Sequence, residues 1–296
     1  MPRRVLQVVA VPDGAPLAAA GELHRFLDTA GVEVRTLAAG PAPSTARPPS
    51  VVLPPMAPSA RSLAALTQLR REARWADVVV LRGRAGAFLA RGAGLRAVWC
   101  VDDPARGRAV PRRRVGATVV PVAVEGGTPD HVDVLPPVVV PPVRLPVAAR
   151  SAARTALGAP DGAPVVLLGA GVGPAAARSL AADAAGAGWW VVPAGADAEL
   201  VLAATDVVVH APVAGSGVAV DTLLRVLAGA APLTPAGGDW AGRSHDSAAF
   251  AAGLGRLADG AARSPAASAA ATEVLERYGP DTAGAQWLAL LGRVGR

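Results

Sequence analysis

A glycine-rich turn with polar neighbours is the strongest chemical signal in this sequence. Gly215, Ser216 and Gly217 follow an apolar run that ends at His210, and a predicted helix with Asp221 in its first turn comes next. Glycines let a backbone approach a ligand closely, and N–H groups at a helix start bind anions. The spacing predicts a phosphate-binding turn, with an ordinary βα turn as the alternative. His210 is either a ligand contact or a structural donor at the strand end.

A second glycine-rich stretch, GAGVGP, is similar to the dinucleotide-binding pattern G-x-G-x-x-G. Gly169 and Gly171 fit that pattern, but Pro174 stands where the last glycine lets helix and strand pack closely. The acidic residue that such a site needs is represented only by Asp197, beyond the best spacing. Arg178 is the first basic side chain after the glycines. The stretch predicts either a ligand-binding turn or a tight structural turn.

The first half of the chain has two further polar turns after apolar runs. Asp13 and Gly14 follow the first run, and Asp102 and Asp103 follow the run AVWCV. Neighbouring carboxylates can accept hydrogen bonds from ligand hydroxyls or act on their protons. The alternative is an ordinary turn, because an Asp before Pro104 is common in turns. We therefore treat all four residues as candidate site residues.

Composition places the chain among globular proteins and limits its partners. Of 296 residues, 52% are hydrophobic and 18% charged, enough for one large or two medium cores. The net charge of +6 comes with only 3% aromatic residues, so no stacking platform for nucleic acid is predicted. Lys, Ile and Asn are absent, which indicates a GC-rich, actinobacterial genome. The single cysteine, Cys100, excludes an intrachain disulfide and a cysteine-based zinc cluster, and its apolar neighbours indicate an inert core thiol.

No segment of the sequence has the pattern of a membrane span or a clear export signal. No apolar run reaches the roughly 18 residues that cross a bilayer. The basic start MPRRVLQVVAV reads as a strand, without a clean cleavage site after it. The sequence therefore predicts a soluble cytoplasmic protein. Arginine clusters at residues 70–74 and 112–114 leave peripheral membrane contact open, and the oligomeric state is undetermined.

The elements that must position these turns alternate between short apolar strands and Ala/Leu-rich helices. Fully apolar strands are typical of parallel sheets covered on both faces. The alternation predicts α/β architecture, with a doubly wound sheet in each half of the chain. The predicted helices of the second half are residues 148–157, 175–185, 198–204, 220–227, 248–258, 265–278 and 281–294.

A proline-rich stretch divides the two series of elements. Residues 134–146, VLPPVVVPPVRLP, carry five prolines, which cannot donate to a sheet ladder and which stiffen a connection. We therefore expect an N-terminal Rossmann-like domain over residues 1–143 and a second over residues 144–296. Two such domains would face each other across a cleft, where ligands commonly bind.

The order of several motifs resembles that of GT-B glycosyltransferases of the family 4 type. DVVVHAPVAGSGVAVDTLLRVLAGAAPLTP resembles the C-terminal strand, glycine-rich turn and helix of that family, and LVLAATDVVV resembles the segment leading into it. SAARTALGAPDGAPVVLLGAG resembles the opening of the second domain, and ADVVVLRGRAGAFLARGAGLRAVWCVDDP resembles part of the first. The tail VLERYGPDTAGAQWLALL resembles helices that return to the first domain. Together these stretches cover most of the chain.

The resemblance implies a hexosyltransferase-like enzyme that moves a sugar from a nucleotide-diphosphate sugar to an unknown acceptor. It implies retention of configuration, no required metal and no cofactor beyond the nucleotide-sugar co-substrate. Asp102, Asp103 and Asp221 would then be catalytic, and Asp13 with Gly14 would form the acceptor-side loop. The donor would be bound by residues of the second domain: Gly169, Gly171, Arg178, His210, Gly215, Ser216 and Gly217.

Several departures from the family pattern leave two other functions open. The family's basic pair after the first strand of the second domain is missing, and Leu224 stands at the expected acidic position. A catalytically degenerate relative that binds a nucleotide, a glycan or a partner protein is therefore one alternative. An NAD(P)-dependent oxidoreductase that uses the GAGVGP stretch is the other.

Overall fold

The computed structural model describes most of the chain and divides it into two compact units. The described residues are 2–9, 14–39, 51–53, 60–82, 97–100, 117–120, 132–142, 146–169, 172, 174–193, 196–210, 219–233 and 247–295. The first unit comprises Met1–Val140 with Arg277–Arg296, and the second comprises Pro141–Glu276. The predicted boundary after residue 143 lies in the same proline-rich stretch.

The first unit is built on a parallel sheet of seven strands in the order β3-β2-β1-β4-β5-β6-β7. Continuous apolar runs form its central strands, as expected for strands that are buried on both faces. The strands are β1 (Arg4–Val9), β2 (Glu33–Ala39), β3 (Val51–Leu53), β4 (Val78–Arg82), β5 (Ala97–Cys100), β6 (Ala117–Val120) and β7 (Val132–Val134).

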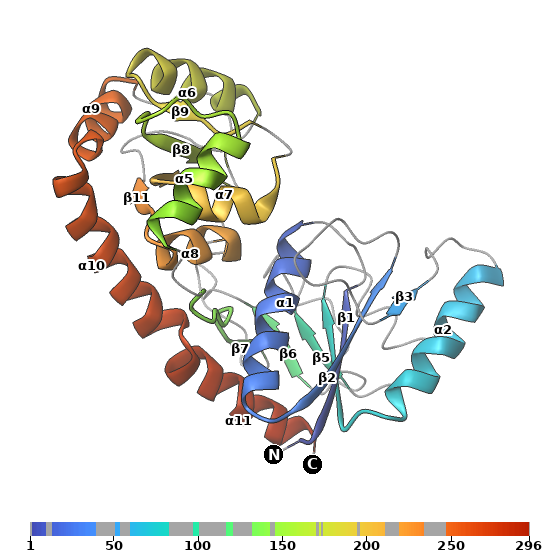
Figure 1. Ribbon diagram of the computed structural model, residues 1–296. Helices are drawn as coiled ribbons and strands as arrows, with labels where there is room; N and C mark the ends of the chain where they lie inside the picture. The colour runs from blue at the N-terminus through green and yellow to red at the C-terminus, as the bar shows by residue number, and fades with distance from the viewer. Residues whose placement is uncertain are drawn as a thin grey trace. The chain divides into compact units, whose positions relative to one another are not determined.

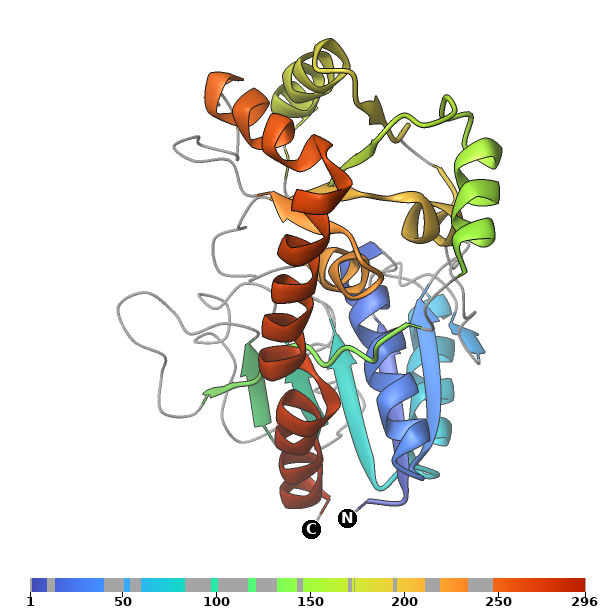
Figure 2. The same ribbon diagram turned by 60° about the vertical axis from the view of Figure 1, so that its left-hand side comes forward.

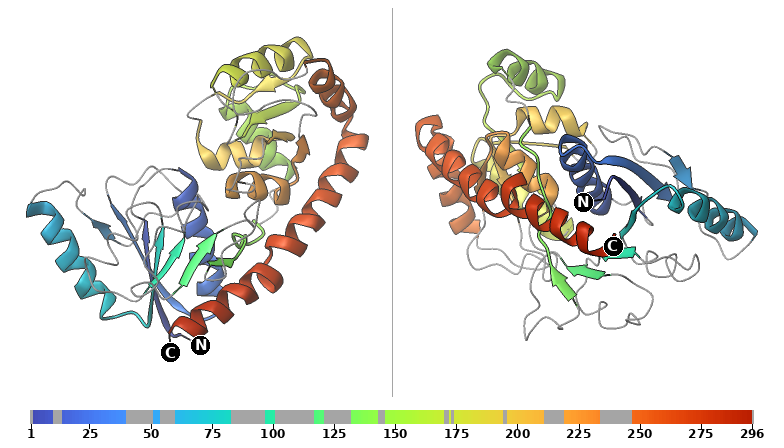
Figure 3. Two further views of the ribbon diagram at one scale, coloured as in Figure 1. Left: turned by 180° about the vertical axis from the view of Figure 1, so that it is seen from behind. Right: turned by 90° about the horizontal axis from the view of Figure 1, so that it is seen from below.

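Helices cover both faces of this sheet. α1 (Gly14–Thr29) lies against one face, and α2 (Ala60–Ala73) lies on the other side of the strands (Figures 1 and 3). α1 ends as the sequence predicts, because Gly31 takes a φ of +76°, which favours glycine. The core on the α1 face joins alternate residues of the strands to Leu23, Phe26 and Leu27 of α1.

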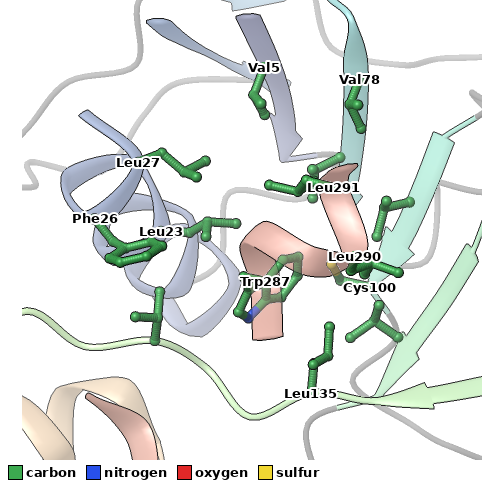
Figure 4. Packing of buried hydrophobic residues seen from close by; sticks show 14 of the residues in the cluster. Val5, Leu23, Phe26, Leu27, Val78, Cys100, Leu135, Trp287, Leu290 and Leu291 are labelled. Atoms are coloured by element: carbon green, nitrogen blue, oxygen red, sulfur yellow. The ribbon is translucent and has the colours of Figure 1, made fainter. Parts of the chain in front are cut away.

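The C-terminal helix belongs to this same core. α11 (Ala285–Val294) places Trp287, Leu290 and Leu291 between α1 and the strands, next to Cys100 of β5 (Figure 4). The Trp287 indole Nε1 donates to the Pro136 carbonyl at 3.0 Å, so the ring is held at both its apolar and its polar side. A π-helical turn over Pro280–Gly284 precedes α11.

The second unit has a smaller parallel sheet of four strands in the order β11-β10-β8-β9. Its strands are β8 (Val165–Leu168), β9 (Trp190–Val191), β10 (Val207–Val209) and β11 (Ala231–Leu233). Its helices are α5 (Val147–Ala156), α6 (Pro174–Gly186), α7 (Ala198–Ala204), α8 (Val220–Leu227), α9 (Ser247–Ala258) and α10 (Gly260–Tyr278). One core packs α6, α9 and α10 on this sheet, and α5 lies on the opposite side (Figure 2).

The start of α10 differs from the prediction. Because proline favours the first helical turn, the sequence indicates a helix that begins at Pro265. In the structure α10 begins at Gly260 and carries Pro265 inside it. The earlier start has a local cause: the Asp259 carboxylate accepts from the Ala261 N–H at 2.9 Å and caps the helix. This stabilises a first turn that the sequence pattern alone does not reveal.

The predicted fold class is confirmed: two doubly wound α/β units, each on a parallel sheet, follow one another along the chain. No helix in the described part of the chain combines the length and apolar character of a membrane span.

Candidate functional site

The carboxyl edge of the second sheet contains a point where the strand order reverses. β8 lies beside β9 on one side and beside β10 on the other, and β11 lies beyond β10. In open α/β sheets ligands bind outside the carboxyl ends of the strands at such a switch point. Here the two strands end at Leu168 and Val209, which pair in register. Both predicted glycine-rich turns follow these two strand ends.

Gly169 directly follows β8 at a close approach of two backbones. Its N–H donates to the Val209 carbonyl at 2.8 Å, which extends the ladder by one residue. A Cβ at this position would lie 2.7 Å from that carbonyl oxygen and 3.3 Å from Thr222 Oγ1 of α8. Only glycine leaves room for this junction of β8, β10 and α8. Gly169 therefore positions the edge by its lack of a side chain.

α8 begins beside this junction, and no side chain caps its first turn. Its N-cap, Ala219, supplies no side-chain hydrogen bond, and Asp221 lies exposed in the first turn. A carboxylate there is stabilised by the helix dipole. Leu224, one turn later, is half-buried, while Thr222 and Val226 are buried and anchor the helix. The only acidic group of α8 is thus Asp221.

Two other donor-side candidates, His210 and Arg178, belong to or directly follow elements that meet at this edge. His210 directly follows β10, is half-buried, and donates its backbone N–H to the Leu233 carbonyl at 3.1 Å. Arg178 lies exposed on α6, the helix that follows β8. Among the described residues, no hydrogen bond or ion pair joins Arg178 to His210 or Asp221. The structure therefore places these residues on neighbouring elements and does not assemble them into a bonded cluster.

Arg225 of α8 is a cation that the sequence analysis missed. Its Nη1 donates to the Asp221 carbonyl at 2.7 Å, and its buried Nε has no partner. Burial lowers the pKa of this guanidinium below its ordinary value, and the Asp221 carboxylate acts in the opposite direction. The (i, i+4) spacing from Asp221 is typical of an exposed helical ion pair, so the sequence pattern gave no sign of burial.

Seven candidate residues lie outside the described part of the chain. They are Asp13, Asp102, Asp103, Gly171, Gly215, Ser216 and Gly217. Gly14 is described as the first residue of α1, directly after one of these stretches. The assignments of all these residues as catalytic, donor-binding or acceptor-side groups stay predictions.

The opposite, amino edge of the second sheet carries a charge cluster. The Asp206 Oδ1 accepts from Arg154 Nη2 at 2.6 Å and from Arg150 Nη2 at 3.2 Å, and Arg263 lies 3.7 Å away. Its Oδ2 accepts from the Val165 N–H at 2.9 Å, so the carboxylate joins β10 to β8. Burial lowers the pKa of the Arg150 guanidinium, Asp206 opposes this, and the neighbouring cations add to the lowering.

A cavity of about 670 Å³ opens beside this cluster. Arg150, Asp206 and Arg263 line it together with hydroxyl and apolar residues of α10. Because Asp206 already receives hydrogen bonds from the arginines around it, the charges serve to hold α5 and α10 to the sheet. We therefore place the candidate site at the carboxyl edge.

Comparison with known proteins relates the whole chain to glycosyltransferase structures. The structure of a glycosyltransferase from Rickettsia africae superposes with a TM-score of 0.65 at 11% identity, over 98% of both chains. The HepE protein of Anabaena, in complex with UDP and glucose, superposes with a TM-score of 0.62 at 12% identity, over 99% of this chain and 100% of that chain. The lipopolysaccharide glycosyltransferase WaaG gives a TM-score of 0.53 at 14% identity, over 91% of this chain and 95% of that chain.

These similarities show that the chain has the GT-B fold. No protein-family model matches the sequence, and no curated protein matches it. The superpositions show that the backbone arrangement is shared. At identities of 11–14% they do not show a shared activity.

Proposed function

We propose that this protein is a glycosyltransferase that takes a sugar from a nucleoside-diphosphate sugar and passes it to an acceptor. The observation that carries the proposal is the switch point between β8 and β10. Both predicted anion-binding turns follow that point, and α8 begins beside it. The GT-B fold supports the proposal, because HepE with this fold is known in complex with UDP-glucose.

In the proposed reaction the diphosphate is the leaving group, so negative charge develops on its oxygens. Backbone N–H groups of the Gly215–Gly217 turn and the positive end of α8 would stabilise that charge, as pre-organised dipoles do elsewhere. Arg178 on α6 is the exposed cation that follows β8, and we assign it a donor-binding role. Asp221 would hold a donor hydroxyl, since its carboxylate is exposed in the first turn of α8.

The finer parts of the proposal concern the first unit and the stereochemistry. Along the chain, Asp102 and Asp103 follow β5, Asp13 follows β1, and Gly14 is the first residue of α1. From this order along the chain we assign all four residues to the acceptor side. Transfer with retention and without a metal is proposed from the family resemblance alone.

A binding protein without transferase activity is the second candidate function. The α8 position at which the family pattern has an acidic residue is occupied by Leu224, which is half-buried. A protein of this kind would bind a nucleotide sugar without turning it over. Donor hydrolysis therefore separates the two candidates, because many transferases slowly pass their sugar to water.

A panel of nucleotide sugars is expected to raise the melting temperature of the full chain. A ligand that binds only the folded state at 100 times its dissociation constant adds about 2.7 kcal/mol to the free energy of unfolding. We expect a concentration-dependent rise with at least one UDP-, GDP- or dTDP-sugar, measured by differential scanning calorimetry. NADH is the control for the oxidoreductase alternative. A rise with NADH and with none of the nucleotide sugars would contradict the proposed function.

Replacing Arg178 by Ala is expected to weaken binding of the active nucleotide sugar about tenfold or more, because a charge-assisted contact to the diphosphate is lost. Titration calorimetry measures the dissociation constant. Arg256→Ala is the matched control, since Arg256 is likewise an exposed arginine of the second unit, in the last turn of α9. Equal dissociation constants for Arg178→Ala and Arg256→Ala would remove Arg178 from the donor site.

A further inference from the structure

Arg82, the last residue of β4, is a buried cation without a counter-charge in the described structure. Only 8% of its surface is exposed, and its Nε has no hydrogen-bond partner. No carboxylate of a described residue lies within ion-pair distance of its guanidinium. Burying an unpaired charge is unfavourable, so such a group is usually paired or binds a ligand.

Three other arginines of the first unit differ in this respect. On the same unit Arg25 pairs with Glu22 at 2.7 Å, Arg35 pairs with Glu72 at 3.3 Å, and Arg293 pairs with Asp133 at 2.8 Å. All three are far more exposed than Arg82. The least exposed of these cations is therefore the one without a carboxylate partner among the described residues.

Arg82 also lies at the switch point of the first sheet. β1 is followed outward by β2 and β3 on one side and by β4 on the other. Arg82 pairs in register with Val9, the last residue of β1, so both mark the carboxyl ends of the two strands at which the order reverses. This is the place where open α/β sheets bind ligands.

The side chain is held in a fixed direction by its neighbours. Val78, Val80 and Arg82 alternate onto the sheet face that packs against α1 and α11, and the Arg82 guanidinium lies 5.6 Å from the centre of the Trp287 ring. Trp287 is itself fixed by its bond to the Pro136 carbonyl. An aromatic face stabilises a guanidinium without using its N–H donors, which leaves them available for an anion.

A second unpaired polar atom lies on the same face. Gln7 of β1 is fully buried, its Nε2 donates to the Ala20 carbonyl at 3.0 Å, and its Oε1 has no partner. Gln7 precedes Val9 by two residues on β1, and Val9 pairs with Arg82, so the two side chains occupy adjacent rows of this face. A buried donor and a buried acceptor that both lack partners therefore lie two residues apart in the register of β1 and β4.

We propose that Arg82 binds an anionic group of the acceptor, a phosphate or a carboxylate, at the carboxyl edge of the first sheet. The planar guanidinium offers parallel N–H donors that match either group. The identification of the anion as part of an acceptor rests on the proposed function. The anion site itself does not depend on that function.

The anion site is tested by titrating the full chain with inorganic phosphate, and separately with acetate, in a calorimeter at constant ionic strength. We expect saturable binding of at least one anion that becomes about tenfold or more weaker in Arg82→Gln. Phosphate bound at the proposed donor site of the second unit would not be weakened by Arg82→Gln, so the variant distinguishes the two sites. Arg35→Gln is the control, since Arg35 already pairs with Glu72. Anion binding that is absent, or equal in Arg82→Gln and the unsubstituted protein, would overturn the proposal.

Arg82→Lys covers the case in which Arg82→Gln does not fold. It keeps the charge and loses the two parallel donors, so anion binding should weaken while the circular dichroism spectrum stays unchanged. Equal binding in Arg82→Lys and the unsubstituted protein would contradict bidentate recognition by Arg82.

The acceptor is tested with a hexose, a hexose phosphate and a hexuronate, using the active donor. We expect transfer to one anionic acceptor to fall about tenfold or more in Arg82→Gln, while donor hydrolysis by water stays unchanged. Hydrolysis without preference for an anionic acceptor would refute this inference and leave the proposed function standing. Anion binding that depends on Arg82, without any donor turnover, would refute the proposed function and leave the anion site standing.

Discussion

Replacing Asp206 by Asn is expected to lower the free energy of unfolding of the second unit by about 3 kcal/mol. The Asp206 side chain is only 6% exposed, and Arg150, Arg154 and Arg263 surround it. Asn keeps the volume and one carbonyl oxygen but removes the charge. The cations would then repel one another without compensation. Removing one partner of a buried ion pair usually costs 3–5 kcal/mol, and the partial exposure of these arginines favours the lower end.

Hydrogen exchange followed by mass spectrometry measures this loss where it occurs. The chain forms two compact units, so a single global transition would not report on the second unit alone. We expect faster exchange of the amides of β8 and β10, which the Asp206 carboxylate connects through the Val165 N–H. Exchange in β1 and β4 should stay unchanged.

The matched control is Asp133→Asn, which breaks an ion pair at the surface. Asp133 accepts from Arg293 Nη2 through both oxygens at 2.8 Å, but the Arg293 side chain is largely exposed. Exposed pairs contribute about 1 kcal/mol or less. Equal losses for the two variants would show that Asp206 does not act as a buried counter-charge.

The elements of this fold could be predicted because their signals are local. The predicted helices over residues 198–204 and 220–227 agree with α7 and α8. α7 also has a capping residue in the sequence, since the Asp197 carboxylate accepts from the Glu199 and Leu200 N–H groups. Asp197 is therefore a helix cap here, a structural role that the sequence pattern for a dinucleotide site did not assign to it.

The polar groups that matter inside the units could not be predicted in the same way. Arg82 ends an apolar strand and Asp206 precedes one, and both positions are usual for exposed residues at a sheet edge. Their burial depends on α11 and α5, which come from distant parts of the chain. Strand periodicity contains no information about such partners, so neither residue was among the predicted site residues. Gly169 was predicted as part of a ligand loop, whereas the structure adds a packing reason for it.

Replacing Gly169 by Ala is expected to impair both the stability and the proposed activity of the second unit. The new Cβ would lie 2.7 Å from the Val209 carbonyl oxygen, a backbone atom that cannot move without shifting β10. Overpacking of this kind costs about 1–3 kcal/mol. Any movement that relieves it displaces the strand ends from which both glycine-rich turns start.

A displacement of about 1 Å at a site of this kind can reduce the rate about 100-fold. We therefore expect Gly169→Ala to lose donor turnover to roughly this extent, even at temperatures where the unit is still folded. Steady-state kinetics at a low temperature, with circular dichroism as the check on folding, measures this effect.

Gly255→Ala is the control for the Gly169 experiment, because a Cβ at Gly255 in α9 would meet no atom within 4 Å. That change should stabilise the second unit by about 0.5–1 kcal/mol, as alanine in place of glycine does within helices. Opposite signs of the two stability changes would locate the effect in the junction of β8, β10 and α8. Unchanged donor turnover in Gly169→Ala would show that the carboxyl edge of this sheet does not hold the donor, and would thereby contradict the proposed site.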